Sequence, residues 1–110
     1  MFESHDKILE ALRAGRFIRL VSVDGVEVYV FRGVERDYIV SPCRFCMCYD
    51  FIINVLGKRS KVVCYHIVGF EIAQRRGKLR VVRVSSEELA DIVLEIVLQG
   101  FSATLRRVLK

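Results

Sequence analysis

The residues best suited to metal chemistry are gathered in one quarter of this 110-residue chain. All four cysteines and one of the two histidines lie in two short stretches, Cys43-Arg-Phe-Cys46-Met-Cys48 and Cys64-Tyr-His66. Thiolate sulfur and imidazole nitrogen are the ligands that zinc takes in structural sites. In a reducing compartment, clustered cysteines are more typical of metal sites than of disulfides. The sequence therefore predicts a metal site.

The spacing indicates how four ligands could converge. In a strand, residues two apart point to the same side, so Cys46 and Cys48 can direct both sulfurs at one point. Cys64 and His66 have the same separation, which would turn them roughly 200° apart in a helix. We therefore expect Cys64 just before a helix and His66 in its first turn, giving a tetrahedral Cys₃His set for one Zn²⁺.

Cys43 is the surplus cysteine. It stands three residues before Cys46, the gap found in zinc knuckles, so it could replace Cys48 as a ligand. The residues alone leave both arrangements open, as well as the reading in which the cysteines are small buried apolar side chains.

Four protein ligands fill a zinc shell, whereas catalytic zinc keeps one position for water. The nearest carboxylates, Asp50 and Glu71, have no recognisable hydrolase spacing. The pattern thus favours a structural ion and a protein that is not an enzyme. A thiol enzyme using Cys43 would need a lowered thiol pKa, which sequence does not reveal.

The elements around these residues are predicted from local patterns. Residues 4–14 read as a helix that Ser4 could cap. Asp24-Gly25 joins two β-rich runs, residues 16–23 and 26–32, in a hairpin, and a third strand follows at 37–41. These strands form an antiparallel meander.

The second half reads mainly as helix. A helix is expected over 65–76, ending at Gly77, and a short strand or extended link over 79–84. Ser85 and Glu88 form a capping box that opens a helix ending at Gly100, and the tail 101–110 adds a last helical piece. The fold class is α+β, a single domain over 1–110 with a finger core at about 38–76.

Composition limits where the protein works. No run of uncharged apolar residues is long enough for a membrane span, and the acid-containing N-terminus is unlike a signal peptide. A cytoplasmic location is expected. Asn and Gln total only three, which indicates a thermophilic source. We expect that source to be prokaryotic and archaeal.

The order C-x-C, fifteen residues, C-x-H resembles the SWIM-type zinc finger. From about Val26 to Leu98 the chain is similar to the small Sws/Shu-type subunit, in the stretches VYVFRG, PCRFCMCYDFIINVL, KVVCYHIVGFEIA and VSSEELADIVL. The resemblance implies one structural zinc on Cys46, Cys48, Cys64 and His66. It departs at Tyr49, where proline is frequent, and at Tyr65, where a basic residue is common; neither is a ligand.

The same resemblance implies a function. Sws/Shu-type subunits pair with a RecA/Rad-type recombinase paralogue and help the main recombinase assemble on single-stranded DNA during homologous recombination. A nucleoid-associated accessory subunit in DNA repair is therefore expected. The rival hypothesis is a stand-alone DNA-binding regulator with a SWIM finger.

Two surfaces could serve these functions. Apolar residues extend past the core stripe of the last long helix. Close packing within the domain would account for them about as well as an obligate protein interface, and we favour the interface, in a heterodimer. Self-association is the fallback. The candidates for the partner interface are Leu94, Leu98, Phe101, Leu105 and Leu109.

Basic residues supply candidate DNA contacts, in a chain whose net charge is +5. Such runs are more often solvated faces than a track for the phosphates of single-stranded DNA. Tyr49 and Tyr65 beside the metal could stack on bases. The candidate DNA contacts are Lys58, Arg59, Lys61, Arg75, Arg76 and Lys78.

Overall fold

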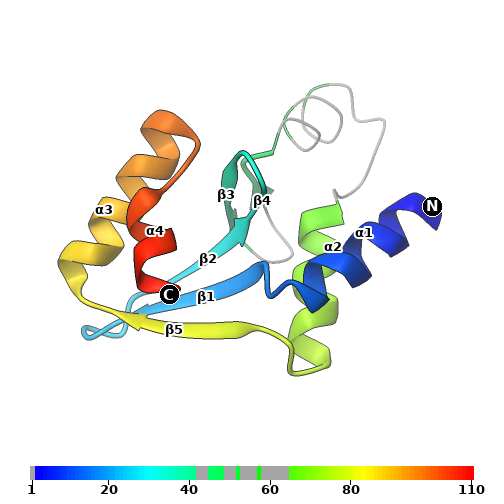
Figure 1. Cartoon of the computed structure of the whole chain (residues 1–110), viewed down its shortest axis with the longest axis horizontal. Coiled ribbons are helices and arrows are strands. Elements are labelled where there is room, and N and C mark those ends of the chain that lie inside the picture. Colours follow the sequence, from blue (N-terminus) through cyan, green and yellow to red (C-terminus); the bar gives the residue numbers. More distant parts are fainter. Residues whose placement is uncertain (1, 42–44, 49–51, 53–56, 58–64) are drawn as a thin grey trace.

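The computed structural model describes residues 2–41, 45–48, 52, 57 and 65–110 (Figure 1). Its elements in chain order are α1 (Phe2–Arg13), β1 (Phe17–Ser22), β2 (Glu27–Arg32), β3 (Asp37–Ser41), β4 (Phe45–Cys46), α2 (Tyr65–Arg75), β5 (Arg80–Val84), α3 (Ser86–Gln99) and α4 (Ala103–Val108). The predicted α+β class is confirmed. No helix among these residues has the length and apolar character to cross a bilayer.

The strands form one sheet in the order β4-β3-β2-β1-β5. The pairs β1–β2, β2–β3 and β3–β4 are antiparallel, which confirms the meander. β5 pairs in parallel with β1, with Ile18 opposite Arg80. The segment predicted as a strand or link is thus an edge strand, and its partner lies about sixty residues earlier in the chain.

Local sequence features account for the element ends. Gly25, with φ of 85°, closes the hairpin between β1 and β2, a conformation that glycine adopts without strain. Ser85 and Glu88 form the predicted capping box at the start of α3, and Gly100 ends it with φ of 75°. The first helix begins at Phe2, earlier than predicted, so position 4 lies inside α1 and not at its start.

The sheet carries a hydrophobic core on each face, because successive strand residues point to opposite sides. On one face, Phe17 and Phe31 pack with Phe70 of α2 and Ala11 of α1. On the other face, where α3 and α4 lie (Figure 1), a second cluster joins the sheet to these helices. Its buried residues are Ile18, Leu20, Val30, Val84, Leu89, Ile92, Ile96 and Leu105.

Polar side chains fix α4 against α3 and the sheet. Glu95 accepts hydrogen bonds from the hydroxyls of Ser102 and Thr104, at 2.8 and 2.7 Å. Arg106 forms a bidentate ion pair with Asp37 of β3, at 2.6 and 3.0 Å, and the Asp37 side chain is wholly buried. The C-terminal helix is therefore an integral part of the fold.

Candidate metal centre

Three predicted ligands come from two neighbouring parts of the fold. Cys46 is the last residue of β4 and lies opposite Val40 of β3. Cys48 follows two residues later. His66 is the second residue of α2, and α2 packs on the face of the sheet that holds Phe17. His66 thus lies in the first turn, as the spacing predicts. All three side chains are buried.

The ligand atoms of this group lie close together. The sulfur atoms of Cys46 and Cys48 and a ring nitrogen of His66 are all within 4.8 Å of one another. The Sγ of Cys46 is 3.6 Å from Nδ1 of His66. In a zinc tetrahedron, bonds of about 2.3 Å to sulfur and 2.0–2.1 Å to nitrogen put these atoms about 3.6 Å apart. The group could therefore hold a metal ion.

Aromatic rings hold the imidazole in place. The His66 ring centroid lies 4.3 Å from that of Phe31 and 5.0 Å from that of Tyr38. Burial raises the pKa of Tyr38, because it disfavours the charged phenolate. A ligand clamped in this way loses little side-chain entropy when it binds an ion.

Phe31 and Tyr38 were not singled out from the sequence. Strand alternation alone does not show that both side chains lie on the α2 face. That becomes clear once the register of β2 and β3 is known, because Phe31 lies opposite Tyr38. The strand register is therefore the signal by which these two residues could have been predicted. Patterns of ligand spacing do not contain it.

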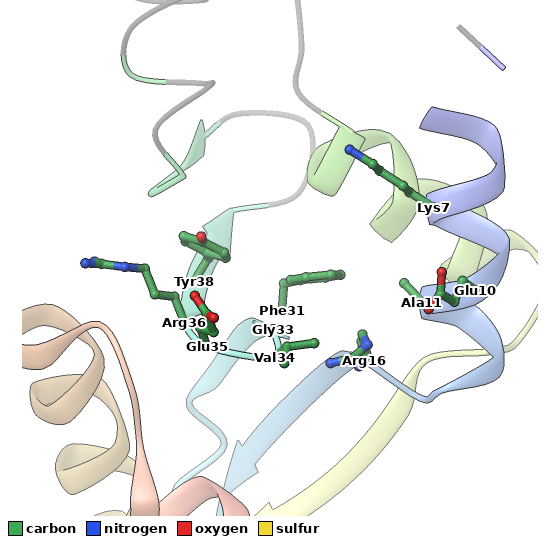
Figure 2. A pocket seen from close by; sticks show the side chains of 10 residues that line it. All are labelled: Lys7, Glu10, Ala11, Arg16, Phe31, Gly33, Val34, Glu35, Arg36 and Tyr38. Atoms are coloured by element: carbon green, nitrogen blue, oxygen red, sulfur yellow. The ribbon is translucent and has the colours of Figure 1, made fainter. Parts of the chain in front are cut away.

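Phe31 and Tyr38 also line a cavity of about 390 Å³ between α1 and the sheet (Figure 2). Charged residues of both signs surround it, so the cavity favours neither anions nor cations. They are Lys7, Glu10, Arg16, Glu35 and Arg36.

Several predicted site residues lie outside the described part of the chain: Cys43, Tyr49, Lys58, Arg59, Lys61 and Cys64. The other candidate DNA contacts, Arg75, Arg76 and Lys78, are exposed at and just after the end of α2. Arg75 forms an ion pair with Glu71 at 2.7 Å, one helical turn before it. That pair is an ordinary surface contact.

The candidate interface residues divide between surface and core. Leu94, Leu98 and Phe101 are 55, 77 and 36% exposed, and Val97, which was not among the candidates, is 54% exposed. Leu109 is half-buried. Leu105 is fully buried in the core, because α4 packs its apolar side inward, so this side chain is not available to a partner.

Comparison with known protein families, characterised proteins and solved structures gives no match to this chain.

Proposed function

We propose that the protein is a non-enzymatic accessory subunit in which one structural zinc ion is held by Cys46, Cys48, Cys64 and His66. The observation that carries the proposal is the buried convergence of Cys46, Cys48 and His66 at the start of α2. Cys64 stands one residue before the first residue of that helix, so a fourth ligand is close in sequence. Zinc would tie β4 to α2, and four protein ligands would leave no position for water.

The exposed apolar face of α3 supports a function in assembly. Leu94, Val97 and Leu98 lie within two turns, and Phe101 follows the helix. Exposed apolar side chains that lie next to one another on one helix face are typical of protein interfaces. We propose that this face binds a RecA/Rad-type recombinase paralogue, and that the pair acts on single-stranded DNA in recombinational repair, as the resemblance of the finger implies.

Elemental analysis of the purified protein tests the metal. We expect one zinc per chain and loss of that zinc in Cys46→Ser. Gln74→Ser is the control, because Gln74 is exposed on α2. Folded protein without metal, or with its thiols joined as disulfides, would contradict the site.

Co-purification from the native host, followed by mass spectrometry, tests the partner. We expect a RecA-like ATPase with the wild-type chain and its loss with Leu98→Lys. Gln99→Lys adds the same charge at the neighbouring exposed position and should keep the partner. If no ATPase is recovered and the chain alone binds DNA with a steep salt dependence, it is a stand-alone regulator.

A further inference from the structure

A second candidate site lies on the opposite face of the sheet from the metal group. Basic side chains from three separate elements line a pocket of about 220 Å³ beside the end of α4. Arg32 is the last residue of β2, Arg80 is the first of β5, and Arg106 belongs to α4. Lys110 and Leu109 complete the lining. The pairing of β5 with β1 is what brings these residues together.

Positive charge in this pocket greatly exceeds negative charge. Among the described residues, the side-chain carboxylate that contacts the lining is that of Asp37, and both of its oxygens accept hydrogen bonds from Arg106. Asp37 also accepts from the backbone N–H of Ser102 at 2.8 Å. Arg16 lines the other cavity, beside α1, and its guanidinium donates to the carbonyl of Arg32 at 2.9 Å. Asp37 is therefore paired with Arg106, and its effect on Arg32 is smaller than the effects of Arg16 and Arg106.

Arg32 is half-buried, as are Arg16 and Arg106. No carboxylate of the described residues forms an ion pair with Arg32. Burial lowers the pKa of Arg32, and the charges of Arg16 and Arg106 lower it further, against a smaller opposite effect of Asp37. Like charges held this close repel one another, and a bound anion would relieve that repulsion.

We propose that the pocket lined by Arg32, Arg80 and Lys110 binds a phosphate group. The planar fork of a guanidinium matches the oxygens of a phosphate, and several converging cations suit its multiple negative charge. The pocket is smaller than the usual site for a whole small molecule, about 300 Å³ or more, so it would hold one phosphate group and not the rest of a nucleotide. The phosphate could be free or part of a nucleic acid strand.

This site goes beyond the proposed function, since it shares no residue with the zinc ligands or with the apolar face of α3. The test uses the zinc-loaded chain and titrates it with pyrophosphate in a calorimeter, at an ionic strength held constant with sodium chloride. Arg32→Gln removes a charge-assisted contact, so we expect pyrophosphate affinity to fall about tenfold or more. Pyrophosphate should also raise the Tm of the wild type and not that of the variant.

Arg83→Gln is the matched control. Arg83 lies on the same strand as Arg80, three residues later and therefore on the opposite face, and it is exposed. The Arg83→Gln variant loses the same charge as Arg32→Gln, and its affinity for pyrophosphate should equal that of the wild type. If Arg32→Gln fails to fold, Lys110→Gln, which is exposed at the last residue, should show the same kind of loss.

A fluorescent single-stranded oligothymidylate distinguishes the two sources of phosphate. Binding that weakens in Arg32→Gln and is displaced by pyrophosphate identifies a nucleic acid backbone as the ligand. Binding of pyrophosphate alone identifies a free phosphate compound. The proposal is overturned if neither probe binds, if Arg32→Gln or its substitute binds as well as the wild type, or if Arg83→Gln loses as much affinity.

Discussion

Asp37 is the buried carboxylate on which the C-terminal part of the fold depends. Its side chain has no exposed surface. The carboxylate accepts hydrogen bonds from Arg106 and from the backbone N–H of Ser102. Removing one partner of a buried ion pair leaves the other charge uncompensated and costs about 3–5 kcal/mol. We expect Asp37→Asn to lower the free energy of unfolding by about 3 kcal/mol in urea denaturation.

Arg106→Met in the Asp37→Asn background is the informative companion. It removes the charge that the first substitution leaves unpaired. The loss in free energy of unfolding should therefore be smaller in the double variant than the sum of the losses in the two single variants. Strict additivity would mean that the two side chains act independently, in spite of their bidentate contact. Neither residue was singled out from the sequence as a partner of the other, because sixty-nine positions separate them.

At the scale of a helix, Gly69 determines how closely α2 packs on β1. Alanine in place of glycine normally stabilises a helix by about 1 kcal/mol. A Cβ at position 69, however, would lie only 2.6 Å from a ring carbon of the fully buried Phe17. Overpacking of this kind costs about 1–3 kcal/mol, so we expect Gly69→Ala to lower the free energy of unfolding.

Two further variants separate packing from helix propensity. Gln74→Ala, at an exposed position of the same helix, should leave stability almost unchanged. Phe17→Leu should cost less in the Gly69→Ala background than in the wild type, because the smaller side chain makes room for the new methyl group. A stabilised Gly69→Ala protein would show that α2 shifts freely on the sheet.

The contact between α3 and α4 is expected to depend on pH. Hydrogen bonds from the side chain and backbone of Thr104 hold the pKa of Glu95 below its ordinary value of 4.5. A lowered carboxyl pKa contributes stability that is present above 4.5 and is lost as pH falls through the folded-state value. Glu95→Gln should therefore show a shallower loss of stability on acidification than the wild type, measured as the urea midpoint at successive pH values.

Asp91→Asn provides the comparison, since Asp91 is exposed on the same helix. Its acid transition should follow that of the wild type. An identical acid transition in Glu95→Gln would mean that the hydrogen bonds to Ser102 and Thr104 do not depend on the charge of the carboxylate.

Over the whole molecule, sequence predicted what local signals determine. The turn at Gly25, the strand Asp37–Ser41 and the capping box of Ser85 and Glu88 each follow from a few adjacent residues, and all three are present. The parallel pairing of β5 with β1 depends on contacts far apart in the chain, which no short pattern encodes.

The same distinction applies to the two candidate sites. Ligand spacing pointed to these residues because Cys46 and Cys48 form one short pair and Cys64 and His66 form another. The ligand atoms of Cys46, Cys48 and His66 do lie together. The phosphate pocket joins Arg32, Arg80 and Arg106, and it becomes visible only when the order of the strands is known. Sites built from distant residues need the tertiary structure before they can be recognised.

Metal removal is expected to affect the molecule as one unit. β1 contributes Phe17 to the core beside the metal group and Ile18 to the core beneath α3, so the two cores share their central strands. A structural zinc site supplies roughly 10–16 kcal/mol of apparent free energy, comparable to the total stability of a domain, about 5–15 kcal/mol. If the proposed zinc is present, a chelator should unfold α3 and α4 together with α2, although neither α3 nor α4 holds a ligand.

Far-ultraviolet circular dichroism and tyrosine absorbance should then report one coincident transition, and chelator already saturated with zinc should have no effect. A separate later transition of the C-terminal helices would instead show that the core beneath α3 is stable on its own.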